Sequence, residues 1–380
     1  MAELARQGAR LGIDTEFMGE GRYRSLLCLV QVAVPDPERP GEVRVEVLDP
    51  LDDRLEPSPL AAVLADPDVE VVMHAGRQDV ALLRRVWGTD VYGLFDTQVA
   101  AGFAGLPAQA GYETLLRELL RVRLRKTASY TRWDARPLSE EQVAYAREDV
   151  LHLLQLADAL EERLSALGRL EWAREECRPL EESSDERSVE MAFERLPRIN
   201  GLDPAARAVA WELAGWREGV AARQDRPVQS VLPDAALVEV AKRKPSAPRQ
   251  LEQIRGLNPG HLRRRGQDIL DAVARGRERP PLPYEGERHP PPAPSDAPLI
   301  ALAESLVRAR AMEAGLAYEL VAARADLQAI MTSAREGRPE PPVRTLAGWR
   351  RELVGSELLE LLAGRRSLAV GPDRRVIVRS

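Results

Sequence analysis

The chain has 380 residues, which exceeds one domain of ordinary size and predicts two or three domains. Hydrophobic residues form 44% of the sequence and aromatic residues only 4%, so the cores must be largely aliphatic. The formal net charge of −6 does not by itself favour a nucleic-acid partner, although a whole-chain value can conceal a basic region.

The sequence carries no signal for a membrane or for secretion. No stretch approaches the roughly 18–20 apolar residues that a membrane span needs, and the N-terminal segment lacks the apolar run of a signal peptide. Cys28 and Cys177 are the only cysteines, too few for a disulfide framework or a zinc site. We therefore expect a cytoplasmic, monomeric protein without a membrane partner.

Short β-like runs come first in the chain. Apolar or alternating patterns predict strands at Leu11–Phe17, Ser25–Val34, Val43–Leu48, Val69–Met73 and Tyr92–Phe95. Helical patterns at Leu60–Leu64 and Asp79–Val86 lie between them. Strands that come early and helices that come late predict a mixed sheet covered by helices.

The pattern becomes helical after these strands. The segment Tyr112–Leu124 has apolar residues at helical spacing. Ser139 and Gln142 form a capping box that predicts the start of a helix reaching about Leu167. The acidic and polar segment Pro179–Ser188 is predicted to be a linker.

Two further helical regions follow. Leu196–Arg279 is helical throughout, and Pro280–Pro298 contains eight prolines, a density that predicts an extended linker. Leu299–Ser380 is again helical, with a β-like end at Arg375–Val378. The predicted organisation is a first domain at residues 1–180, a helical module at 196–280, a linker at 281–298 and a second helical module at 299–380.

Two carboxylates stand at the end of the first predicted strand. Asp14 and Glu16 are two residues apart, so their side chains point to the same face of the strand. Burying two like charges together is costly unless cations neutralise them, and Mg²⁺ or Mn²⁺ prefers oxygen ligands of this kind. Taken alone, a solvated pair of acids is the more common explanation of such a pattern.

Three residues elsewhere extend this acidic pair. Asp79 follows a buried strand and opens a helix, where an acid is also common for electrostatic reasons. Tyr145 and Asp149 are four residues apart on one helix and share a face. Together the four acids fit two-metal hydrolysis of a phosphodiester, in which the cations lie roughly 3.5–4 Å apart. A tyrosine is a weak base near neutral pH, so orientation of the attacking water is the role we expect for Tyr145.

These residues resemble ribonuclease D, a group of the DEDD-type 3′→5′ exonucleases, in its tyrosine subclass. The motifs that carry the resemblance are Asp14-Thr-Glu16, His74-Ala-Gly-Arg-Gln-Asp79, Phe95-Asp-Thr-Gln98, Lys126 with Trp133–Gln142, and Tyr145-Ala-Arg-Glu-Asp149. The resemblance implies an α/β ribonuclease H-like catalytic domain with a mixed sheet, two divalent ions (Mg²⁺ or Mn²⁺) and release of nucleoside 5′-monophosphates. It assigns the four acids to the metals and Tyr145 to the water.

Four other residues of the first domain have weaker indications. The resemblance allows Lys126 and Arg136 to contact the RNA backbone, although basic residues in loops are more often only solvated. We expect His74 to be a structural histidine, because it directly follows a buried strand. Asp96 is expected to be a helix cap or a support rather than a metal ligand.

The first helical module is basic. Residues 197–280 contain 16 Lys and Arg against 10 Asp and Glu, a net charge of +6 that leaves −12 for the rest of the chain. Compact basic clusters suit phosphate contacts with release of counterions. The predicted RNA contacts are Lys242, Arg243, Lys244, Arg263, Arg264 and Arg265.

This region resembles the domain that RecQ-type helicases and ribonuclease D share at their C-termini, and such domains usually bind nucleic acid. The likeness is carried by Trp211 with Trp216-Arg217, Asp225–Val228 and Leu251–Leu257. The final segment resembles a second, more divergent copy, with Trp349–Val354 and Leu361–Arg366 also similar to ribonuclease D. A short likeness between residues 211–223 and 317–324 suggests an internal repeat. The second module could grip RNA or pack on the catalytic domain, and we expect a mixed role.

The resemblance predicts a 3′→5′ exoribonuclease that trims the 3′ ends of tRNA precursors and other structured RNA. A DNA-directed 3′→5′ exonuclease is the alternative, because the acids do not distinguish the sugar. A non-catalytic nucleic-acid scaffold is a third possibility, but the complete set of acids argues against it.

Overall fold

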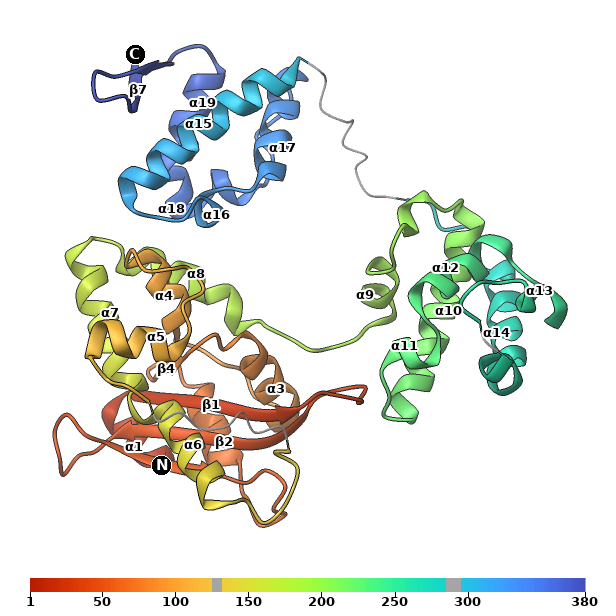
Figure 1. Cartoon of the computed structure of the whole chain (residues 1–380), viewed down its shortest axis with the longest axis horizontal. Helices are drawn as coiled ribbons and strands as arrows, with labels where there is room; N and C mark the ends of the chain where they lie inside the picture. Colours follow the sequence, from red (N-terminus) through yellow and green to blue (C-terminus); the bar gives the residue numbers. More distant parts are fainter. Residues whose placement is uncertain (125–131, 258, 285–294, 380) are drawn as a thin grey trace.

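The computed structural model describes residues 1–124, 132–257, 259–284 and 295–379 (Figure 1). Lys126, a predicted RNA contact, lies outside the described residues. No helix among the described residues is long and apolar enough to cross a membrane.

A five-stranded mixed sheet forms the centre of the first domain. Its strands are β1 (Arg10–Met18), β2 (Leu26–Pro35), β3 (Val43–Leu48), β4 (Glu70–Met73) and β5 (Leu94–Asp96). The order is β3-β2-β1-β4-β5, with β1, β2 and β3 antiparallel in turn and β4 and β5 parallel to β1. The predicted mixed sheet is confirmed.

Helices cover both faces of this sheet. One face packs on α1 (Ala2–Gly8), α2 (Ser58–Leu64) and α3 (Arg77–Trp87), and the other on α4 (Thr97–Phe103), α6 (Glu140–Leu151) and α7 (Leu153–Ala166). Leu11 and Ile13 of β1 are buried in the core between the sheet and the helices α1, α2 and α3. Gly12 and Asp14 alternate with them and point to the other face. A Cβ on Gly12 would lie 3.3 Å from Leu154 Cδ2, so this glycine lets α7 approach β1 closely.

The capping box at Ser139 is confirmed, but the helix that it opens is shorter than predicted. Ser139 Oγ accepts a hydrogen bond from the Gln142 N–H (3.1 Å), and Gln142 Oε1 accepts one from the Ser139 N–H (3.0 Å). The helix predicted to reach Leu167 is divided at His152, whose φ of −110° and ψ of 6° interrupt the helical backbone. The result is two helices, α6 and α7.

Two other predicted elements also differ. The segment Tyr112–Leu124 is not one α-helix: it forms α5 (Tyr112–Leu115) and a π-helix, η1 (Leu116–Leu120), that ends where Arg121 adopts a left-handed conformation. The predicted linker at Pro179–Ser188 begins inside α8 (Leu170–Glu181). Pro179 cannot donate a helical hydrogen bond, but burial of Cys177 and Leu180 stabilises the helix around it.

The first helical unit contains the predicted basic module. Its elements are α9 (Val189–Glu194), η2 (Ile199–Gly201), α10 (Pro204–Arg223), α11 (Val228–Val231), α12 (Asp234–Arg243), α13 (Pro248–Glu252) and α14 (Pro259–Glu278). Phe193 packs into the core that α10, α12 and α14 share, so the packed unit begins before residue 196. Beyond α14, the Leu282 N–H donates to Pro204 O (2.9 Å) and holds the start of the Pro-rich segment against α10.

The second helical unit begins inside the predicted linker. Its elements are α15 (Asp296–Ala314), α16 (Tyr318–Val321), α17 (Arg324–Arg335), η3 (Arg344–Leu346), α18 (Gly348–Arg350), η4 (Arg351–Gly355), α19 (Ser356–Leu362), β6 (Ser367–Val370) and β7 (Val376–Arg379). The β-like end of the sequence is β7, which pairs with β6 in an antiparallel hairpin. The two sequence segments that look alike, 211–223 and 317–324, lie in the long α10 and around the short α16, so they are not structurally equivalent.

The two helical units contact the first domain differently. Trp349 of the second unit is 1% exposed, packs edge-on against Phe103 (ring centroids 4.9 Å apart) and stacks on Trp172 (5.3 Å). Its Nε1 donates to Glu176 Oε2 (3.2 Å), and Arg350 NH2 donates to Glu176 Oε1 (2.8 Å). Of the two alternatives for this unit, packing on the first domain is what the structure shows.

The first unit is held by the loop between β1 and β2. In Figure 1 this loop extends from the sheet toward α11. Tyr23 is 9% exposed, packs with Val220 and Ala221, and donates from its hydroxyl to Glu218 Oε2 (2.8 Å). The Tyr23 N–H donates to Asp225 Oδ1 (3.1 Å). This contact rests on one aromatic side chain and a few polar groups.

Candidate active site

Strand β1 places Asp14 and Glu16 on the sheet face covered by α6 and α7. Asp14 pairs in register with Gln31 of β2, and Glu16 pairs with Leu29. The register shifts between Glu16 and Phe17, so a bulge directly follows the second acid. Both carboxylates are partly exposed, as a site open to a substrate requires.

The other two acids come from helices on opposite faces of the sheet. Asp79 lies in the first turn of α3 and is 8% exposed. Thr15, the residue between the two strand acids, donates a hydrogen bond from its hydroxyl to Asp79 Oδ1. Asp149 lies on α6, one turn after Tyr145, and α6 packs across β1, β2 and β3.

The electrostatics show that the carboxylates of Asp14, Glu16, Asp79 and Asp149 lie close enough to affect one another's ionisation. Burial raises the pKa of Asp14 well above its ordinary value, and the charges of the other three acids raise it further. Burial raises the pKa of Glu16 to about 8, with Asp149 and then Asp79 adding to the shift. Burial likewise raises the pKa of Asp149 to about 7 and that of Asp79 to about 6. Such a cluster is costly when ionised without a counter-charge.

Tyr145 faces the same cluster. Burial raises the pKa of its hydroxyl, and the charges of Asp149, and then of Glu16 and Asp14, add to the shift. The phenol is therefore protonated at neutral pH. Its ring lies 6.0 Å from that of Trp133, which is buried beside α6.

The residues at this position fit a cation. Gln31, beside Asp14 on β2, is fully buried, and neither its Oε1 nor its Nε2 has a hydrogen-bond partner among the described residues. Bound cations and their water molecules would supply hydrogen-bond partners to this buried amide and would neutralise the carboxylates beside it. In the described part of the chain, no three acidic, histidine or cysteine side chains converge closely enough to hold a metal ion in their present positions.

A supporting layer lies beneath the acids. Asp96 accepts hydrogen bonds from the N–H groups of Gln98 and Val99, which caps α4, and from those of Ala75 and Gly76 in the loop before α3. Asp96 therefore has the cap and support role that the sequence indicated, and it holds the turn that presents Asp79.

His74 belongs to the same layer. Its Nδ1 lies 2.9 Å from Thr97 Oγ1, and burial lowers its pKa. Its ring is 5.7 Å from that of Tyr112, a residue that sequence reasoning missed. Burial raises the pKa of Tyr112, and nearby Asp149 and Asp14 add to the shift, which places the phenol beside the acids. No motif in the sequence marks this tyrosine.

The predicted RNA contact at Arg136 is engaged within the protein. Its Nε and NH2 donate to the two carboxylate oxygens of Asp49 (both 2.5 Å), and its NH1 and NH2 also donate to the carbonyls of Trp133, Ala135 and Cys28. This arrangement ties the segment before α6 to the sheet and leaves little of the guanidinium for RNA.

The two basic clusters of the first helical unit also differ. Arg243 is paired with Glu239, and Lys244 contacts Asp203, while Lys242 is exposed. Of the second cluster, Arg263 and Arg264 are exposed and Arg265 is bonded to the carbonyls of Ser230 and Val231. Arg243, Lys244 and Arg265 thus have partners within the protein. Lys242, Arg263 and Arg264 are exposed to solvent.

Comparisons with known proteins agree with this site. Residues 1–165 match the 3′-5′ exonuclease family, and residues 206–273 match the HRDC domain. Ribonuclease D of Gluconacetobacter diazotrophicus is 37% identical over 98% of this chain and 93% of its own length. Ribonuclease D of Granulibacter bethesdensis is 36% identical over 94% of this chain and 88% of its own.

A solved structure supports the same relationship. The crystal structure of Escherichia coli RNase D, described as an exoribonuclease involved in structured RNA processing, superposes with a TM-score of 0.82. The two are 29% identical, and the match covers 96% of this chain and 95% of the other. The mixed sheet, the helical units that follow it and the clustered acids therefore have one explanation: this chain belongs to the ribonuclease D family of 3′→5′ exoribonucleases.

Proposed function

We propose that Asp14, Glu16, Asp79 and Asp149 bind two divalent cations, Mg²⁺ or Mn²⁺, at the end of β1. The supporting observation is the shared pKa rise of four carboxylates drawn from three separate elements. Carboxylate oxygens are the ligands that these hard ions prefer, and two divalent cations would neutralise the four negative charges of this half-buried cluster.

Such ions, when bound, activate a water and stabilise the leaving 3′ oxygen of a phosphodiester. The protein's own side chains position the reactants. Tyr145 retains its proton at neutral pH, so it orients the attacking water by hydrogen bonding and is not the base. Thr15 and Asp96 fix the position of Asp79, directly and through the preceding turn. Attack at the last phosphodiester releases a nucleoside 5′-monophosphate.

The substrate that we propose is the 3′ end of structured RNA, with tRNA precursors as its physiological form. The support is membership in the ribonuclease D family together with the net charge of +6 in residues 197–280. We further propose that the enzyme acts as a cytoplasmic monomer, with residues 1–180 as the catalytic domain. The first helical module covers 196–280 and extends back to α9, the second, a divergent HRDC-like copy, covers 299–380 and begins with α15, and the linker is the part of 281–298 between them.

The metal site is tested by Asp14→Ala. We expect this variant to lose Mg²⁺- or Mn²⁺-dependent release of 5′-mononucleotides while it keeps most of its RNA affinity, because only the metal ligand is removed. The control variant is Met312→Ala, at a side chain that is 67% exposed. We expect this variant to keep full activity. Undiminished release by Asp14→Ala, or by the wild type in excess chelator, contradicts the proposal.

The substrate is tested by comparing a 3′-extended tRNA, a single-stranded RNA and a single-stranded DNA of the same sequence. We expect both RNAs to be shortened and the DNA to be a poor substrate. Equal rates on RNA and DNA would favour a DNA-directed or sugar-indifferent exonuclease instead.

A further inference from the structure

A pocket lined by arginines lies in the first helical unit, outside the acidic site. It has a volume of about 560 Å³ and is formed by the end of α10, the following turn, α11 and the first half of α14. Its lining residues, which we call the arginine pocket, are Val220, Arg223, Gln224, Arg226, Ser230, Arg264, Arg265 and Asp268. Four cations and one carboxylate give it a formal charge of +3 in a chain whose net charge is −6.

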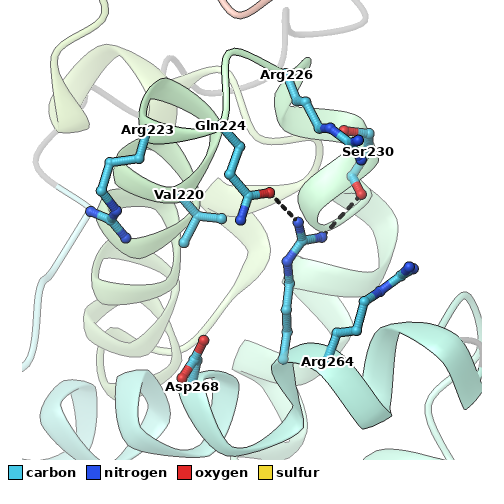
Figure 2. Close-up of a pocket in the computed structure, with 8 residues that line it drawn as sticks. Val220, Arg223, Gln224, Arg226, Ser230, Arg264 and Asp268 are labelled. Carbon is cyan, nitrogen blue, oxygen red and sulfur yellow. Dashed lines mark hydrogen bonds between the residues drawn. The ribbon is translucent and has the colours of Figure 1, made fainter.

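One of these arginines builds the wall. Arg265 donates to Gln224 Oε1 (2.8 Å) and to the carbonyls of Ser230 (3.2 Å) and Val231 (3.0 Å). The bonds to Gln224 and Ser230 are the dashed lines in Figure 2. Burial, and then the charges of Arg264 and Arg226, lower the pKa of Arg265. The guanidinium groups are therefore held close enough to repel one another.

The other three arginines are available to a ligand. Arg223, Arg226 and Arg264 are exposed, and none forms a side-chain hydrogen bond or ion pair with another described residue. In Figure 2, Arg223 lies at the left of the pocket, Arg226 and Arg264 lie at its right, and Asp268 lies at its lower edge. Three exposed guanidiniums without a carboxylate partner among the described residues therefore line one hollow.

A bound polyanion would account for this arrangement of arginines. Guanidinium groups bind phosphate oxygens in a bidentate manner, and several of them around one pocket suit consecutive phosphates better than a single small anion. Asp268 repels anions and so restricts the phosphates to the arginine side. A volume of this size falls within the range of about 300–1,000 Å³ found for specific ligand sites.

The pocket is also connected to the active site. Val220 lines the pocket and packs against Tyr23, and Asp225, between two lining residues, accepts hydrogen bonds from Tyr23 and Arg22. Tyr23 follows β1, the strand that carries Glu16. Even a fully extended chain between these two residues spans at most about 25 Å. The pocket is therefore held near the strand on which the 3′ end would be cut.

We propose that the arginine pocket binds the phosphodiester backbone of the RNA strand upstream of its 3′ end, as a subsite separate from the metal site. This inference rests on the proposed function, since it assumes an RNA substrate. It also replaces part of the sequence-based assignment: Arg264 remains an RNA contact, Arg265 supports the pocket wall, and Arg223 and Arg226 join as contacts that the sequence did not indicate.

The test compares two double variants of equal charge. The pocket pair is Arg223→Gln with Arg264→Gln. The control pair is Arg249→Gln with Arg255→Gln, two exposed arginines of the same unit outside the pocket. Binding of a long, 5′-labelled single-stranded RNA is measured by fluorescence anisotropy in excess chelator, across a range of salt concentrations.

We expect the pocket pair to weaken binding roughly tenfold or more at low salt. The slope of log affinity against log salt should become shallower by about 1.4, since each phosphate contact on a single strand contributes about 0.7. The control pair should change the slope much less. An unchanged slope in the pocket pair, or an equal change in both pairs, overturns the proposal.

Hydrolysis of a dinucleotide in Mg²⁺ separates this proposal from the proposed function. The dinucleotide is too short to reach the pocket, so the pocket pair should hydrolyse it at the wild-type rate. If the wild type releases no 5′-mononucleotide from either the dinucleotide or the long RNA, the proposed function fails. If the wild type succeeds but the pocket pair is impaired, the pocket is not a separate subsite and the present inference is wrong.

Discussion

The two helical units are attached to the catalytic domain by different kinds of contact. The second unit inserts Trp349, 1% exposed, between Phe103 and Trp172 and adds ion pairs from Arg350 to Glu176. The first unit is held by Tyr23 and by polar contacts at the surface, and it presents a pocket lined by four arginines, three of which have no partner among the described residues.

This difference indicates different roles for the two units. A large aromatic side chain buried between domains contributes mainly to stability. A small polar contact beside a charged pocket leaves surface free for a ligand. We therefore interpret the second unit as an extension of the catalytic domain's hydrophobic core. The first unit is the one that we propose binds RNA.

The largest expected effect is on the second unit. Trp349→Ala should lower the free energy of unfolding by about 3–5 kcal/mol, because it removes a fully buried aromatic ring. Urea unfolding of this variant is compared with that of Met312→Ala, an exposed site on the same unit. A loss no greater than that of the control would show that the interface is not an extension of the core.

The acid cluster should produce an intermediate effect that is confined to the catalytic domain. The folded pKa values of Glu16 and Asp149, about 8 and about 7, lie above the unfolded values near 4. The folded state therefore binds more protons between these limits, so metal-free stability is full below about pH 4 and falls as pH rises toward 8.

We expect the metal-free protein to lose on the order of 2 kcal/mol between pH 6 and 8. Mg²⁺ should restore more stability at pH 8 than at pH 6, because the ionised acids bind it. Thermal unfolding with and without chelator measures both. Stability that rises with pH in chelator would show that the acids are not clustered in the folded protein.

The smallest effect is expected at the first unit. Tyr23→Phe removes only the hydroxyl that donates to Glu218, which should cost about 1 kcal/mol. Affinity for a long RNA should fall while dinucleotide hydrolysis remains normal, since the active site is unchanged. A variant that binds long RNA as the wild type does would show that this contact does not position the pocket.

The sequence predicted those features that depend on local pattern. Apolar runs marked the strands, alternation placed Asp14 and Glu16 on one face, and Ser139 with Gln142 marked a helix start that the structure confirms. These features are encoded within a few neighbouring residues, so a single sequence suffices to find them.

Features that depend on distant partners were missed. The break at His152 is not visible in a continuous helical pattern. From the sequence alone, Arg136 resembles a solvated loop cation. Its partner Asp49 is 87 residues away in the chain. The arginine pocket joins α10 to α14, so Arg223 and Arg226 had no recognisable relation to Arg264 before the chain was folded.

The central claim, that four acids form a site for two divalent ions, is tested most directly by counting bound Mn²⁺. Calorimetric titration at pH 8 uses an RNA whose last linkage resists hydrolysis. We predict two Mn²⁺ ions per wild-type chain, and loss of at least one with Asp14→Asn, which removes a charge but preserves shape. Two ions bound to Asp14→Asn with wild-type affinity would contradict the account.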